Sequence, residues 1–155
     1  GRKGRGENGF RPAEAQRRET VMVNRDDLES FFIRMDLEYE EVGPSMYLVR
    51  GKTTGYPTVV HCADALLLIR MKVMDLPAMG DKEALGLYRA LLELNATDIV
   101  HGAYGIEDKE LILSDTLELE TLDFQELQAS IESMELAASG HMERIRALAG
   151  AGAEG

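Results

Sequence analysis

The sequence has a single cysteine, three histidines and no long apolar run. Cys62 cannot form an internal disulfide, and its isolation is typical of a reducing compartment. No stretch approaches the ~18 consecutive apolar residues that a membrane-spanning helix needs. Residues 1–19 are polar and basic, so they do not resemble a secretory signal. We therefore expect a cytoplasmic protein that makes no contact with a membrane.

Basic residues are also scarce beyond residue 19. Residues 1–19 hold six of the 17 basic residues and three of the 28 acidic ones, which leaves a net charge of −14 on the remainder. Such an acidic body repels phosphate groups and favours basic partners. Residues 1–20 are predicted to be a flexible arm, because Gly- and Arg-rich segments bury little apolar surface. A solvated tail is the favoured interpretation. Two alternatives are that the arm folds back on the acidic body, or that it offers nucleic acid a weak contact through Arg2, Lys3, Arg5, Arg11, Arg17 and Arg18.

The chain has 155 residues, of which 45% are hydrophobic. That length suits one domain, and the apolar share is enough for a core without a disulfide or a metal. A single domain is predicted over residues 21–148, followed by a flexible tail of small residues at 149–155.

Capping residues and periodicity predict the first elements. Asn24 is a predicted N-cap, and apolar residues follow it at helical spacing, namely Leu28, Phe31, Phe32 and Met35. Turn signals at Gly43 and Gly55 separate strands predicted at 46–50, 58–63 and 66–74, and residues 39–42 are taken to extend the first of these. The connections are too short for crossover helices, so antiparallel pairing is predicted.

The second predicted helix, residues 82–94 with Asp81 as its cap, is apolar on two neighbouring stripes. One stripe contains Leu85, Tyr88 and Leu92, and the other contains Ala84, Leu87, Leu91 and Leu94. One sheet in a domain this small cannot cover both stripes, so a second subunit is predicted to cover the helix.

Two further strands are predicted at 99–106 and 110–113. A last helix is predicted to begin after Asp123, because Asp123 and Glu126, three residues later, resemble a capping box. The predicted buried stripe of that helix is Leu127, Ile131, Met134, Ala138, Ile145 and Leu148. The element order, α-β-β-β-α-β-β-α, predicts an α+β fold in which helices flank an antiparallel sheet.

No set of residues converges on a catalytic or metal site. Gly51-Lys52-Thr53 lacks both the earlier glycine and the following helix of a phosphate-binding loop. His61 and Cys62 are neighbours on one predicted strand, so their side chains point to opposite faces and cannot form a nucleophile–base pair. The three histidines fall on different elements without ligand spacing. We therefore predict no catalysis, no metal and no cofactor.

Three segments carry a family resemblance: LYRALLELN at 87–95, GAYGIEDKEL at 102–111 and LDFQEL at 122–127. With these segments and its element order, the chain resembles the YbjN family of bacterial proteins over residues 24–148. That family shares its fold with the type III secretion chaperones of the Tir-chaperone type. The basic arm is an addition relative to those chaperones.

The resemblance implies a homodimer formed through the second helix and the strand after it. The residues that this implies for the dimer interface are Ala84, Leu87, Tyr88, Leu91, Leu94, Ile99 and His101. It also implies that a client protein lies across the first helix and the first strands. The residues that this implies for client binding are Phe31, Phe32, Met35, Met46 and Tyr47.

The resulting hypothesis is a non-catalytic, dimeric, chaperone-like adaptor that holds a segment of a client protein in a stress or regulatory pathway. One alternative is a regulator that acts with nucleic acid, or with a partner bound to it, through the basic arm. A second alternative is a small-molecule sensor that uses the cavity between helix and sheet. For that function the sequence offers no specific polar anchor.

Overall fold

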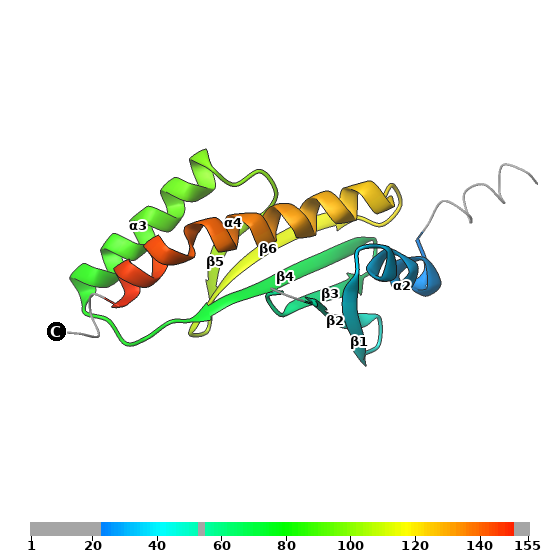
Figure 1. The fold of residues 1–155 in the computed structure, drawn as a ribbon, viewed down its shortest axis with the longest axis horizontal. Helices are drawn as coiled ribbons and strands as arrows, with labels where there is room; N and C mark the ends of the chain where they lie inside the picture. Colours follow the sequence, from blue (N-terminus) through cyan, green and yellow to red (C-terminus); the bar gives the residue numbers. More distant parts are fainter. Residues whose placement is uncertain (1–22, 53–54, 151–155) are drawn as a thin grey trace, which may run out of the picture.

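The computed structural model describes residues 23–52 and 55–150. In these residues three helices and six strands follow one another along the chain (Figure 1). Their order and bounds are α2 (Arg25–Arg34), β1 (Leu37–Gly43), β2 (Met46–Gly51), β3 (Thr58–Ala63), β4 (Leu66–Asp75), α3 (Asp81–Thr97), β5 (Ala103–Glu107), β6 (Glu110–Glu118) and α4 (Phe124–Gly150).

The six strands form one sheet in the order β1-β2-β3-β4-β6-β5, and every neighbouring pair is antiparallel. The predicted α+β class with an antiparallel sheet is therefore confirmed. The number of strands differs from the prediction, because residues 39–42 belong to a separate strand, β1, that pairs with β2. Ser45 turns the chain between them with a φ of 56°.

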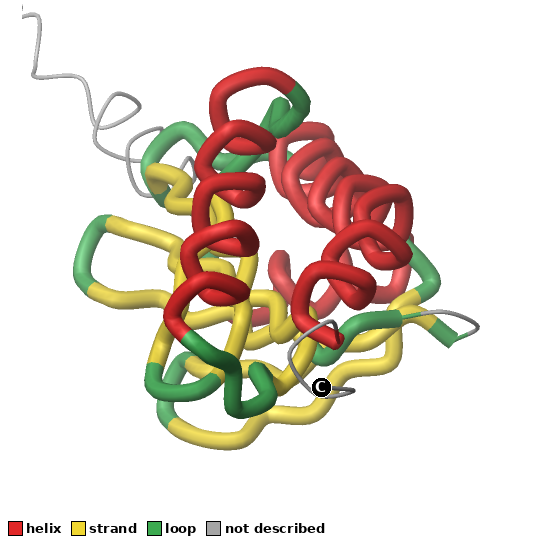
Figure 2. The backbone as a smooth tube through the Cα atoms, turned by 90° about the vertical axis from the view of Figure 1, so that its left-hand side faces the viewer, coloured by secondary structure: helices red, strands yellow, loops and turns green. Residues whose placement is uncertain are grey.

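The helices cover one face of this sheet. Register places Tyr47, Val60, Ile69 and Asp115 in one row across β2, β3, β4 and β6. At one end of the row, Phe32 of α2 packs on Tyr47, with ring centroids 5.5 Å apart. At the other end, α4 crosses the sheet and lies beside α3 (Figures 1 and 2). The single core lies between these helices and the sheet.

Local sequence signals account for two of the helix starts. The Asn24 side chain accepts from the Asp27 amide, and Asp27 accepts in return from the Asn24 amide, which completes a capping box. Asp123 accepts from the Glu126 amide at 2.8 Å at the start of α4. Both predicted caps are confirmed. The prediction for α3 was wrong, because its N-cap is Gly80, which has no side chain to accept a bond.

Two helix ends also differ from the prediction. Helix α3 continues to Thr97, three residues beyond the predicted end. Helix α4 reaches Gly150 and buries Ala149, so the boundary predicted after residue 148 falls two residues too early. The predicted buried stripe of α4 lies in the core except for Leu148, which is partly exposed and packs against it.

Candidate protein-binding site

One exposed stripe of α3 is apolar. Leu85 and Leu92 are 69% and 68% exposed, and Tyr88 between them is 40% exposed. They are spaced three and four residues apart, so they form one stripe along the helix. Burying such a stripe away from water lowers the free energy by about 25 cal/mol per Å² of apolar surface. This face of α3 therefore favours contact with another protein surface.

A hollow of about 210 Å³ lies between α3 and β5, next to the exposed stripe. It is lined by Tyr88, Leu91, Leu92, Asn95, Tyr104, Gly105 and Ile106. Asn95 fixes the two elements, because its side chain accepts from the Tyr104 amide at 2.7 Å and donates to the Tyr104 carbonyl at 3.2 Å. The stripe, the hollow and the exposed Ile106 of β5 together are called the α3–β5 surface below.

The α3–β5 surface corrects the predicted interface. Leu87, Leu91 and Leu94 are buried in the core of the same chain, because they face α4 and the sheet. They are therefore not free for a second subunit. The exposed apolar residues of the α3–β5 surface that the prediction did not include are Leu85, Leu92 and Ile106. Leu85 and Leu92 belong to the first of the two apolar stripes that the sequence predicts on this helix, so their helical spacing was visible in the sequence.

The other four residues of the predicted interface differ in exposure and lie partly on α3 and partly after it. Tyr88 lies on the exposed stripe, whereas Ala84 is only partly exposed and lines a neighbouring hollow. Ile99 and His101 are partly buried in the connection after α3, since β5 begins at Ala103. The strand predicted at 99–106 was therefore wrong in its first half.

The client residues predicted on α2 and β2 divide into buried and accessible ones. Phe32 and Tyr47 are 0% and 1% exposed, so they hold α2 to the sheet and cannot contact a client in the folded chain. Phe31 is partly exposed and packs edge to face against Phe124 of α4, with centroids 5.7 Å apart. Met35 and Met46 are also partly exposed.

Accessible apolar groups missed by the prediction lie beside these residues. Ile33 on α2 is exposed, as are Tyr39 and Val42 on β1. Strand β1 pairs only with β2, so its other edge is unpaired in the described residues. Free strand edges accept an additional strand readily. Glu38 and Glu40 place carboxylates on this edge strand.

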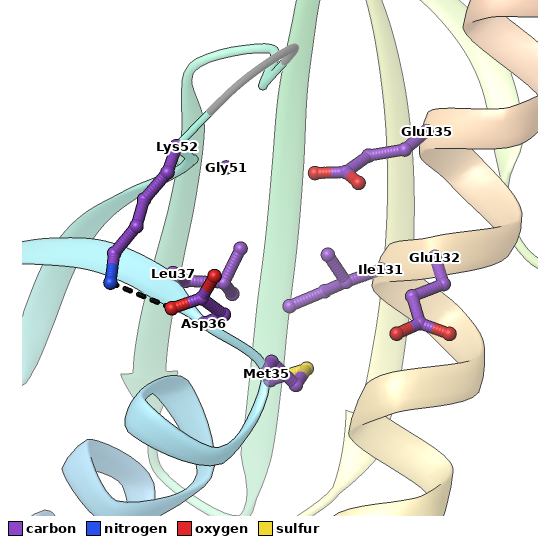
Figure 3. Close-up of a pocket in the computed structure, with 8 residues that line it drawn as sticks. All are labelled: Met35, Asp36, Leu37, Gly51, Lys52, Ile131, Glu132 and Glu135. Carbon is purple, nitrogen blue, oxygen red and sulfur yellow. Dashed lines mark hydrogen bonds and ion pairs between the residues drawn. The ribbon is translucent and has the colours of Figure 1, made fainter.

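A second hollow of about 210 Å³ opens where α2 ends and β1 begins (Figure 3). Met35 supplies accessible apolar surface, whereas Leu37 and Ile131 are 8% and 1% exposed and form its inner wall. Ile131 and Glu135 point into the hollow from α4. Asp36, Glu132 and Glu135 are its carboxylates, and Lys52 donates to Asp36 at 2.6 Å. Burial, and then the charge of Glu132, raises the pKa of Glu135. This space is called the α2–α4 pocket below.

Chemistry-bearing side chains do not assemble elsewhere into a site. Within residues 23–52 and 55–150 no three His, Cys, Asp or Glu residues are grouped to hold a metal ion. Cys62 faces the core side of β3 beside Tyr47, and burial raises the pKa of its thiol. His61, the next residue, projects to the other face. None of the helices described has the length and apolarity needed to cross a membrane.

One histidine is part of a structural network. The Tyr104 hydroxyl and His141 Nδ1 lie 2.8 Å apart, and His141 Nε2 lies 3.2 Å from a carboxylate oxygen of Asp98. The three residues join β5, α4 and the end of α3. Burial also raises the pKa of the Tyr104 phenol. A neutral, hydrogen-bonded phenol of this kind fits a structural role.

A family model matches the sequence over residues 22–151, and its description is CesT_Tir_1. The match covers nearly the whole chain. This chain belongs to the CesT_Tir_1 family. The comparison with curated proteins finds no match.

Solved structures share the fold of this CesT_Tir_1 chain. YbjN from E. coli, described as a proposed transcription regulator, superposes with a TM-score of 0.56 at 12% identity, covering 79% of this chain and 95% of YbjN. A chain of the heterodimeric ExoU–SpcU complex, from the type III secretion system of Pseudomonas aeruginosa, gives a TM-score of 0.55 at 13% identity. That alignment covers 79% of this chain and 97% of the other. The predicted resemblance to YbjN and to type III secretion chaperones is confirmed.

Parts of the sequence predictions lie outside the described residues of this CesT_Tir_1 chain. They are the six basic residues of the arm, Thr53 and the tail beyond Gly150. The described part of Gly51-Lys52-Thr53 ends β2, where Lys52 pairs with Asp36. In the described residues that follow, the next element is strand β3 rather than a helix, so Lys52 lacks the context of a phosphate-binding loop.

Proposed function

We propose that this CesT_Tir_1 chain is a non-catalytic adaptor that works as a homodimer and holds an extended segment of another protein. The observation that carries the proposal is the α3–β5 surface, an exposed apolar helix face beside an apolar hollow. The family supports it further, because one chain of similar fold comes from the two-protein complex ExoU–SpcU.

A second copy of the chain is the proposed cover for the α3–β5 surface. Two copies related by a twofold axis bring the same patch together from both sides, so Leu92 of one copy contacts α3 or β5 of the other. Stable interfaces bury about 1,600 Å² in total, and α3, with 17 residues, is the longer of the two elements proposed to supply this surface.

The proposed client lies along the free edge of β1. An extended segment paired with β1 gains main-chain hydrogen bonds, and Ile33, Tyr39 and Val42 provide apolar contacts nearby. Glu38 and Glu40 favour a client with basic side chains. Client binding and dimerisation therefore use opposite ends of the sheet, since β1 and β5 are its two edge strands.

Light scattering on the full chain tests the dimer. At micromolar concentration the expected mass is twice 17.2 kDa. A mass of 17.2 kDa over that concentration range would remove the homodimer from the proposal.

Quantitative affinity purification from the native host tests the client site. Val42→Glu places a charge on β1, so client proteins recovered with the wild-type bait should be lost. Leu136→Glu is the matched control, because Leu136 is an exposed apolar residue of α4 distant in sequence from β1. Equal recovery with all three baits would mean that the client, if bound, lies elsewhere.

A nucleic-acid regulator is the second candidate, favoured by the similarity to YbjN and by the six basic residues of the arm. Binding of a labelled duplex should then weaken steeply between 50 and 200 mM salt, by about tenfold or more. Replacing the six arm residues by Gln should abolish it. Binding that survives this replacement would place the contact on the acidic body instead.

A further inference from the structure

The α2–α4 pocket combines apolar surface with negative charge. Met35, Leu37 and Ile131 line it, and three carboxylates surround them. Lys52 is the one basic side chain in the lining, and it is already paired with Asp36. Among the described residues, Glu132 has no basic partner and Glu135 has neither an ion pair nor a hydrogen bond. The pocket therefore suits an occupant that brings both an apolar group and positive charge.

The charge around the pocket is not confined to its lining. From Glu110 to Glu143 the sequence contains nine acidic residues and no Lys or Arg. This stretch includes most of α4, the helix that supplies Ile131, Glu132 and Glu135 to the pocket. A basic segment near α4 consequently meets a continuous negative field, which attracts it before any specific contact forms.

The N-terminal segment of the same chain has the matching composition. Residues 1–19 contain six basic residues and three acidic ones, and Phe10 is their only aromatic residue. Arg11 follows Phe10 directly, and Arg17 and Arg18 come soon after. An aromatic ring next to a guanidinium fits an apolar pocket with a carboxylate rim, because each half finds its counterpart there.

Chain length allows this segment to reach the pocket. The first described residue, Val23, lies two residues before the start of α2, and Met35 at the pocket immediately follows the helix. Helix α2 has 10 residues and is therefore about 15 Å long. Twelve residues lie between Phe10 and Val23, and the thirteen Cα-to-Cα steps that join them span up to about 45 Å when extended. The connecting chain is therefore longer than α2, and Phe10 can lie at the pocket without the chain being fully extended.

We propose that the basic N-terminal segment, residues 1–19, binds in the α2–α4 pocket of its own chain, with Phe10 on Met35 and its arginines on Glu132 and Glu135. Leu37, at the start of β1, belongs to this pocket. The segment therefore occupies the beginning of the client edge. If the proposed client function holds, the segment is an internal competitor that a client must displace.

Photo-cross-linking of the full chain tests the position of the segment. With p-benzoylphenylalanine at position 10, irradiation should join residue 10 to Met35 of the same chain. Peptide mass spectrometry identifies the joined residues. Cross-links that fall on α3 or β5, that join two chains, or that are absent would overturn the proposal.

Matched charge variants test its electrostatic basis in the same experiment. Glu132→Gln with Glu135→Gln should reduce the cross-link about three- to tenfold, as should raised salt. Glu120→Gln with Glu143→Gln removes the same charge from exposed positions outside the pocket and should leave the yield unchanged. If both pairs of substitutions lower the cross-link yield equally, the acidic body attracts the segment only in a general way, and the proposal of a specific site is overturned.

Titration of Glu135 by NMR supplies a second readout. Arginine beside this carboxylate favours its charged form, so Arg17→Gln with Arg18→Gln should raise the pKa of Glu135. An unchanged pKa of Glu135 would contradict the contact.

Light scattering on the same samples distinguishes this inference from the proposed homodimer. A monomer whose residue 10 cross-links to the pocket would refute only the dimer, and a dimer without that cross-link would refute only this inference.

Discussion

Leu91 and Leu92 are consecutive residues of α3 whose side chains point about 100° apart around the helix, one toward the core and one toward solvent. Leu91 is 5% exposed and belongs to the core, whereas Leu92 is 68% exposed on the α3–β5 surface. A helix turns by about 100° per residue, so one step along the sequence is enough to exchange core for solvent. The two side chains are chemically identical, and their expected mutational effects are therefore separable.

Leu92→Glu should dissociate the dimer without unfolding the chain. The substitution puts a charge into the proposed interface, which should raise the dimer dissociation constant about 30-fold or more. Light scattering across a dilution series measures this change. Ile33→Glu, at an equally exposed apolar position of α2, should leave the mass unchanged. A dimer of unaltered strength in Leu92→Glu would exclude this face.

Leu91→Glu should instead destabilise the fold itself. It buries a carboxylate among core side chains, which should lower the free energy of unfolding by about 3 kcal/mol or more. Urea denaturation measures the loss. The opposite ranking, in which Leu92→Glu unfolds more readily than Leu91→Glu, would contradict the assigned faces of α3.

Phe32→Ala should cost far more stability than Ile33→Ala. Phe32 is fully buried against Tyr39 and Tyr47, so its removal leaves a cavity and should cost about 3–5 kcal/mol. Ile33 is exposed, and its truncation should change the free energy of unfolding by about 0.5 kcal/mol or less. Comparable losses in chemical denaturation would return Phe32 to the list of candidate client contacts.

His141→Ala should destabilise the junction of α3, β5 and α4. It removes the hydrogen-bond partner of the Tyr104 hydroxyl, and leaving such a buried group unpaired costs about 1–3 kcal/mol. His101→Ala is the control, since the structure shows no side-chain hydrogen bond from His101. Denaturation of both variants should separate them, and equal stability would mean that the Tyr104–His141 contact is dispensable.

Glu135 should make the protein less stable as pH rises above the ordinary carboxyl range. Its pKa is raised in the folded state above the usual 4.5, so the folded chain holds this proton more tightly than the unfolded chain does. Stability from this group is therefore present at low pH and is lost as pH rises through the folded pKa. In an Arg17→Gln, Arg18→Gln background, where these arginines do not offset burial, Glu135→Gln should be more stable than its parent at pH 7, with a smaller difference at pH 4. Glu143→Gln controls for the general loss of one negative charge, and an equal gain there would contradict the role of burial.

Short-range sequence signals predicted much of the fold. Asn24 and Asp123 cap helices because their side chains are adjacent in sequence to the amides that they accept from. The alternation from Leu67 to Val73 placed four side chains of β4 in the core. Strand β1 was merged with its neighbour because Glu38, Glu40 and Glu41 break the apolar alternation. An edge strand permits this, since much of its surface remains in water.

By itself the sequence determined that α3 has two apolar stripes, that α2 carries adjacent phenylalanines and that the body is acidic. Only the tertiary structure decided which stripe and which phenylalanine are free to bind. Periodicity tells which side chains share a face, but the cover of that face comes from residues distant in the chain. Leu91 is buried because the chain returns as α4, and Leu92 is exposed because nothing in the described residues covers it. That long-range packing made Leu92, rather than Leu91, the candidate for contact with a partner.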